Sequence, residues 1–271
     1  MLESFLVTSR ETLEVSLVIG IVLSYLNRTN NRNYKKTVFY AIGFGIVASI
    51  IAALIFTFFA GGFEGRAEQL FEGITMIAGA FLISTMILWM MRQKHISGEI
   101  EVKVQSHLEN TKPLFSHFGI FMLIFVAIIR EGVETVIFLN AINYASGINF
   151  LGGTLGILSA IAVGCIFFVG AKKINLRKLF SMSSILLILF AAGLIAHGVH
   201  ELEETGILPG IVTPLFDINH IVNENGILGS FLKGLFGYNG NPSLLEVLSY
   251  AVYLGFILYL YKRAENFKAA A

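Results

Sequence analysis

The chain has 271 residues, of which 55% are hydrophobic and 14% charged, and its net charge at pH 7 is +1. This composition is typical of a membrane protein rather than of a soluble domain. The net charge does not indicate any class of partner, and from the composition we expect membrane lipid around the chain and no nucleic acid. The single cysteine, Cys165, excludes an intrachain disulfide bond and a cysteine-rich metal site.

Apolar runs long enough to cross a membrane follow one another along the sequence. A helix needs about 20 residues to cross roughly 30 Å of hydrocarbon. The first run lacks the basic start and the cleavage site of a secretory signal, so we expect a retained helix there. We therefore predict an all-α polytopic membrane protein that forms a single transmembrane domain. Its seven predicted transmembrane helices cover residues 2–26, 37–60, 73–91, 117–141, 151–171, 179–196 and 244–261.

Basic residues follow the first, third, fifth and seventh predicted helices, whereas the other connections are mostly acidic or uncharged. Because basic loops stay in the cytoplasm, this alternation predicts an outside N-terminus and a cytoplasmic C-terminus. The connection at 92–116 is then a cytoplasmic loop, and the long connection at 206–243 is an outer loop. The basic residues are Arg28, Arg32, Lys35, Lys36, Arg92, Lys94, Lys103, Lys112, Lys172, Lys173, Arg177, Lys178, Lys262, Arg263 and Lys268.

An Arg-Glu-x-x-Glu motif occurs in the first predicted helix and again in the fourth. The two copies consist of Arg10, Glu11 and Glu14, and of Arg130, Glu131 and Glu134. Residues three and four positions apart share one face of a helix, so each copy presents its charges together. One charged residue at the centre of a membrane helix costs about 2.5 to 3.5 kcal/mol. This cost favours a functional role over simple helix packing.

Each motif copy begins a group of three predicted helices, the first at about 1–91 and the second at about 117–205. The third and sixth helices also begin alike, with Leu70-Phe71 and Leu179-Phe180. An odd number of helices gives the two groups opposite topology, as in many transporters. We therefore predict two inverted three-helix repeats followed by a seventh helix at 244–261, with the four glutamates converging near the midplane.

Four carboxylates around one axis suit a hard multivalent cation. The absence of a Cys or Met cluster beside the motifs argues against Cu(I). Arginine has no lone pair to give to a metal. We expect Arg10 and Arg130 to hold Glu14 and Glu134 in bidentate ion pairs until a metal replaces them.

A second polar group lies where the topology places the outer surface. Its helical spacing predicts an outer access site that would concentrate cations electrostatically. The predicted residues of this outer access site are Glu72, His200, Glu201 and Glu204. We interpret the nearby Glu64, Glu68 and Glu203 as surface charge.

These features resemble the high-affinity iron permease family, which includes fungal permeases that work beside a multicopper ferroxidase and bacterial EfeU-type permeases. The resemblance rests on the two motif copies, on Glu72-Gly73, and on the segments at 198–202 and 205–209. It implies transport of iron across the plasma or bacterial inner membrane into the cytoplasm, as Fe³⁺ taken directly or after oxidation of Fe²⁺. It also implies that Glu11, Glu14, Glu131 and Glu134 handle the metal. A ferroxidase or an extracellular or periplasmic iron-delivery protein is the partner it suggests, and no organic cofactor is expected.

Other functions also fit the residues. Glutamates carry protons as readily as metals, so a transporter of another hard or divalent cation, or a cation/proton antiporter, is an alternative. A membrane di-iron enzyme usually has Glu-x-x-His on facing helices, which the two motif helices lack. A subunit that only anchors a partner oxidase is a further alternative, and such a subunit would tolerate loss of the glutamates. The sequence has no phosphate-binding loop, so we expect that this chain does not hydrolyse ATP. We expect a membrane transporter and not an enzyme.

Overall fold

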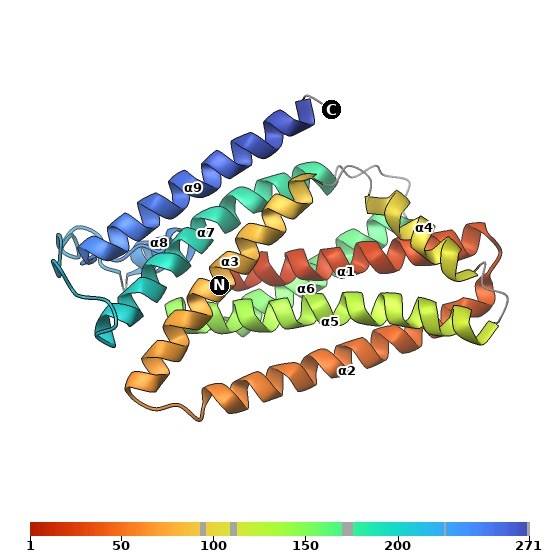
Figure 1. Cartoon of the computed structure of the whole chain (residues 1–271), viewed down its shortest axis with the longest axis horizontal. Coiled ribbons are helices and arrows are strands. Elements are labelled where there is room, and N and C mark those ends of the chain that lie inside the picture. The colour runs from red at the N-terminus through yellow and green to blue at the C-terminus, as the bar shows by residue number, and fades with distance from the viewer. Residues whose placement is uncertain (93–95, 109–112, 170–175, 225, 270–271) are drawn as a thin grey trace.

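The structure is a computed structural model that describes residues 1–92, 96–108, 113–169, 176–224 and 226–269. These described ranges form nine α-helices and a short 3-10 helix, with no β-strand, which confirms the all-α prediction (Figure 1). The helices are α1 (Leu2–Arg28), α2 (Lys35–Ala60), α3 (Arg66–Arg92), α4 (Ile96–Leu108), α5 (Pro113–Ser146), α6 (Phe150–Val169), α7 (Leu176–Glu204), α8 (Ile227–Phe236) and α9 (Leu244–Ala269), and the 3-10 helix is η1 (Arg32–Tyr34).

A helix occupies the described part of each of the seven predicted ranges, and most of these helices extend beyond a predicted end. Two further helices were not predicted: α4 lies in the connection at 92–116, and α8 lies in the connection at 206–243. Lys94 and Lys112 in the first of these connections, and Lys172 and Lys173 in a later one, lie outside the described residues.

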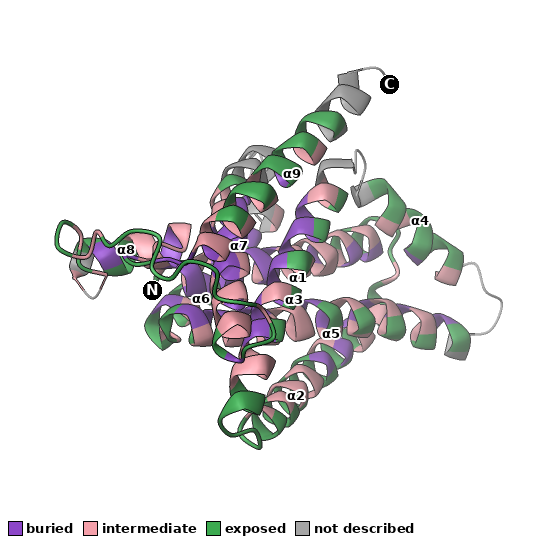
Figure 2. Cartoon of the chain, turned by 60° about the vertical axis from the view of Figure 1, so that its left-hand side comes forward, coloured by how far each residue is buried: buried purple, intermediate pink, exposed green. Residues whose placement is uncertain are grey.

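Within the described ranges, four helices are long and apolar enough to cross a membrane by length and composition alone: α2, α3, α7 and α9. Few residues in the spans of α2 and α9 are buried, as Figure 2 shows. On α2 the exposed side chains include Leu54 and Phe58, which are 66% and 79% exposed. A long helix with a large outward apolar surface is stable only where lipid covers that surface. The chain is therefore a polytopic membrane protein.

The helices pack mainly as three pairs, α1 with α6, α2 with α5, and α3 with α7, and α9 lies along α7 (Figure 1). Small residues permit the close approach within the first two pairs. On α6, Thr8 of α1 fills the space that a Cβ at Gly156 would need. On α5, Ser49 of α2 does the same at Gly132.

Two apolar cores lie at different levels along α1 and α5. One contains Val7 of α1 and Phe138 of α5, together with residues of α3, α7 and α9. The other contains Val22 of α1 and Ile128 of α5, together with residues of α2 and α4. The two charged motifs fall between these cores on both helices. The fold therefore places them at one level in the interior of the bundle.

Candidate metal transport site

The packing of α1 against α5 brings the two motif copies together. Glu11, Glu131 and Glu134 each offer a carboxylate oxygen, and these three atoms lie within 4.8 Å of one another. Glu11 and Glu131 are buried, at 3% and 4% exposure. Three of the four glutamates predicted to converge are thus within reach of one ion.

Glu14 lies one turn further along α1 and is not part of this close group, although only 11% of its side chain is exposed. One of its carboxylate oxygens is buried and makes no hydrogen bond within the described residues, and the same is true of one oxygen each of Glu11 and Glu131. A buried polar atom without a partner costs free energy. The site therefore has acceptor oxygens available for a cation.

Arg10 is buried at 1% exposure and forms only loose ion pairs with its motif glutamates. Its guanidinium nitrogens lie 3.7 Å from Glu11 and 3.5 Å from Glu14. Its hydrogen bonds go instead to the sulfur atoms of Met86, at 2.6 Å, and Met90, at 3.2 Å. The structure thus differs from the expected bidentate pair with Glu14, because two thioethers of α3 compete for the guanidinium.

Arg130 donates two hydrogen bonds to the adjacent Glu131 rather than to Glu134. Its Nε donates to Glu131 at 2.8 Å and its Nη2 donates to the same oxygen, while Glu134 lies 3.7 Å away. About half of the Arg130 side chain is exposed, at 51%, and its guanidinium lies 5.5 Å from the ring centre of Trp89. The two arginines therefore occupy equivalent motif positions in different surroundings.

One face of α3 contacts both arginines, through Met86, Trp89 and Met90. Sequence reasoning missed these residues and found no methionine cluster at the site. The three- and four-residue spacing places them on one helix face. That spacing is common in any apolar helix, so it could not have singled them out without the packing of α3 on α1 and α5.

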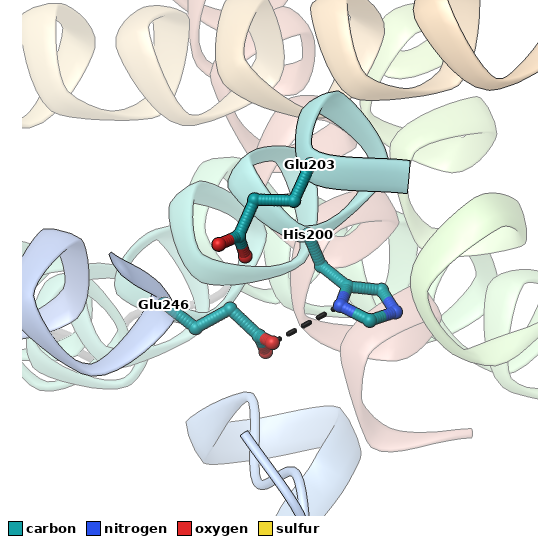
Figure 3. A group of neighbouring side chains, drawn as sticks. All are labelled: His200, Glu203 and Glu246. Carbon is teal, nitrogen blue, oxygen red and sulfur yellow. Dashed lines mark hydrogen bonds and ion pairs between the residues drawn. The ribbon is translucent and has the colours of Figure 1, made fainter. Parts of the chain in front are cut away.

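A second group of possible metal ligands lies at the C-terminal end of α7. It consists of His200, Glu203 and Glu246, which offer ligand atoms within 4.8 Å of one another (Figure 3). The sequence predicted His200 as a residue of the outer access site, but it indicated only surface charge for Glu203 and no role for Glu246. Glu204 contacts His200 Nε2 at 3.3 Å and accepts a hydrogen bond from Gln69. The predicted Glu72, Glu201 and Glu204 do not belong to this close group. The spacing of His200 and Glu203 was a usable signal, whereas Glu246 comes from α9.

A polytopic helical fold with buried charges at one level between its helices defines a membrane transporter. The profile of the iron permease FTR1 family matches residues 1–263 of the chain. The chain is 30% identical over 257 residues to the ferrous iron permease EfeU of Yersinia pestis, covering 92% of this chain and 89% of that protein. It is 27% identical over 255 residues to the ferrous iron permease EfeU of Escherichia coli, covering 92% and 91%. No solved structure matches the chain.

The chain therefore belongs to the iron permease FTR1 family. It is a membrane transporter of iron, and the expected resemblance to iron permeases is confirmed.

Proposed function

We propose that the chain carries iron into the cytoplasm through seven transmembrane helices, α1, α2, α3, α5, α6, α7 and α9, with the N-terminus outside. The first six form two inverted repeats, at about 1–91 and 117–205, and α9 provides the seventh helix. An inverted repeat exchanges α1 with α5, α2 with α6 and α3 with α7, so the pair α1 with α6 becomes the pair α5 with α2. Both pairs occur, which supports the repeat.

Iron is held near the midplane by Glu11, Glu14, Glu131 and Glu134. The observation that carries this proposal is the cluster of buried carboxylate oxygens within 4.8 Å, with several oxygens lacking hydrogen bonds in the described structure. An oxygen-only donor set suits a hard cation such as Fe³⁺. The buried location removes competing water, which strengthens the attraction between the glutamates and the ion.

Arg10 and Arg130 neutralise the glutamates when no ion is present. An incoming cation repels both guanidinium groups and takes over their carboxylates. Arg130 is half exposed and can move toward Trp89, whereas Arg10 stays anchored on Met86 and Met90. The exchange therefore begins at Arg130.

Iron reaches this site by way of the outer access site near His200. The relatives are named ferrous iron permeases, which favours Fe²⁺ as the form that the protein meets outside. The glutamate site favours Fe³⁺, so a ferroxidase or another iron-delivery protein remains the partner that we predict. A ferroxidase partner would transfer one electron from each Fe²⁺ to molecular oxygen, which is reduced to water with uptake of protons, before translocation.

Uptake of radiolabelled iron into proteoliposomes that contain the purified chain tests this function. We expect uptake by the wild type and none by the Glu14→Ala/Glu134→Ala double variant, with Fe²⁺, Fe³⁺, Zn²⁺ and Mn²⁺ offered side by side. Glu64→Ala is the matched control, because Glu64 is exposed in the connection between α2 and α3. Equal uptake by the double variant would overturn the site, and preference for Zn²⁺ or Mn²⁺ would favour a transporter of another cation.

A further inference from the structure

We propose that His200, Glu203 and Glu246 form a second metal site, which binds iron as Fe²⁺ before the ion reaches the paired glutamates. The site is distinct from the midplane cluster in its residues, in its helices and in its donor atoms. The proposal rests on the proposed function only in naming iron as the ion. Binding of a metal at these residues is tested separately from transport.

The geometry of the group suits one ion. His200 and Glu203 lie in the last turns of α7, and Glu246 lies in the first turn of α9. In Figure 3 the three side chains point toward one another. Metal bonds to imidazole nitrogen and carboxylate oxygen are about 2.0 to 2.2 Å long, so two ligands of one ion lie at most about 4.4 Å apart. Atoms already within 4.8 Å therefore need only a small adjustment.

Neighbouring groups hold the two carboxylates in place, as they do around ligands in metal sites. Glu246 is 2% exposed, and it accepts hydrogen bonds from the Asn239 side chain and the Ser243 backbone N–H, both at 2.9 Å. The Ser243 hydroxyl donates to Glu203 at 2.5 Å. A solvated helix end would not order its carboxylates in this way. The outer connection thus supplies a supporting layer for the site.

Glu203 has a buried oxygen that makes no hydrogen bond within the described part of the chain. Its other oxygen is the one that accepts from Ser243. A buried carboxylate oxygen without a donor is unfavourable, and a cation provides the missing partner. Both carboxylate oxygens of Glu246 already accept hydrogen bonds, so the evidence for a bound cation comes from the unpaired oxygen of Glu203.

His200 contacts a carboxylate through each of its two ring nitrogens. Its Nε2 lies 3.3 Å from Glu204, while its Nδ1 lies 3.0 Å from Glu246. A histidine ligand usually contacts a carboxylate through the nitrogen that does not bind the metal. Glu204 fills that role here. Nδ1, which is hydrogen-bonded to Glu246, is then the nitrogen that would bind the metal in its deprotonated form.

The donor set defines the class of ion. One imidazole nitrogen and two carboxylate oxygens suit first-row divalent ions such as Fe²⁺, whereas Ca²⁺ and Mg²⁺ prefer oxygen ligands alone. The midplane cluster has carboxylates only. The two sites therefore differ in the form of iron that they favour, and the outer one fits the divalent form.

Anaerobic equilibrium binding of Fe²⁺ to the full chain in lipid nanodiscs, read by iron analysis, tests the site. We expect Glu203→Gln and Glu246→Gln each to weaken one Fe²⁺ site about tenfold to hundredfold. Glu64→Gln, which removes the same charge in an exposed connection, should bind like the wild type. Unchanged Fe²⁺ binding by both Glu203→Gln and Glu246→Gln would overturn the proposal.

A structural role for the His200 and Glu246 contact gives a different result. If this contact only joins α7 to α9, Glu246→Gln lowers the melting temperature and Glu203→Gln leaves Fe²⁺ binding intact, which contradicts the proposal. Transport is judged independently. Loss of Fe²⁺ binding in Glu203→Gln upholds the site even if proteoliposomes take up no iron, and iron uptake with normal binding in that variant removes the site alone.

Discussion

Arg10 and Arg130 hold the same position in two copies of one motif, yet they differ in burial and in partners. Arg10 is enclosed and donates to two sulfur atoms, whereas Arg130 is half exposed and donates to Glu131. A guanidinium at the surface exchanges its partners at lower cost than a buried one. If the motif glutamates hold iron as proposed, we expect the two halves of the site to have different roles during loading.

Replacing Arg130 by lysine should reduce the initial rate of iron uptake about tenfold, because a hydrogen bond to a charged group contributes about 1.5 to 3 kcal/mol. A lysine ammonium cannot reproduce the paired donation of Nε and Nη2 to Glu131. Uptake by proteoliposomes measures the effect. Wild-type rates in Arg130→Lys would show that only the positive charge matters.

The thioether of Met86 should determine how strongly Arg10 competes with iron. In Met86→Leu the guanidinium keeps Met90 as an acceptor, but Nη1, which donated to Met86, becomes free to turn to Glu11, 3.7 Å away. We expect a higher KM for iron with a stability change below about 1.5 kcal/mol, since the volume is conserved.

Met76→Leu is the matched control for this variant, because Met76 is 1% exposed and belongs to the apolar core of α3, α5 and α7. Its KM should stay at the wild-type value. An unchanged KM in Met86→Leu would mean that the sulfur contact has no part in iron binding.

At the scale of elements, the seven long helices were predictable and the two short ones were not. The long runs are marked by their apolar length, with charges inside them almost confined to the two motifs, and this is the dominant signal in a membrane protein. The ten residues of α8 are too short to cross a membrane and fold only against α1, α5 and α7. Helices that depend on tertiary packing leave little trace in a local pattern.

The candidate sites also contain some residues that the sequence could predict and others that it could not. Glu11, Glu131 and Glu134 were predictable, because the repeated motif gives both their spacing and their partner helix. Met86 and Glu246 were not, because they are brought to the sites by contacts of α3 and α9 that no local spacing encodes. The observed pairing of Arg10 differs from the expected one because contacts of α3 bring Met86 and Met90 to its guanidinium.

The end of α8 is fixed to α7 by two glycines. A Cβ at Gly193 would lie 2.5 Å from the Cα of Gly237, which has a left-handed φ of 65°. Gly193→Ala should therefore displace α8 and lower stability by about 1 to 3 kcal/mol. Thermal unfolding in detergent measures this change.

Gly43→Ala is the control, because nothing lies within 4 Å of a Cβ built at Gly43 on α2. Its melting temperature should equal or exceed that of the wild type, since alanine favours a helix. Equal stability of the two variants would show that the contact of α8 with α7 is not close.

For the whole molecule, the alternation of basic and acidic connections predicts which ends of the helices face the cytoplasm. In a Cys165→Ser background, Glu64→Cys should react with a membrane-impermeant maleimide added to intact cells. Ser106→Cys on α4 should react only after the membrane is opened. Both positions are exposed in the structure. The reverse labelling pattern would invert the topology.

The proposed inverted repeat would account for the meeting of two distant motifs, since it relates α1 to α5 and these two helices pack against each other. The two apolar cores on either side then keep the charges at one level of the bundle. If this level is exposed first to one side of the membrane and then to the other, the ion crosses while the helices that hold it stay close together.

Anomalous scattering at the iron absorption edge, measured on crystals of the full chain grown with iron, tests the central claim most directly. We predict an iron peak between the carboxylates of Glu11, Glu131 and Glu134, and its loss in Glu131→Gln. Iron-loaded crystals with no peak between these carboxylates would contradict the account, because iron would then be carried by other residues.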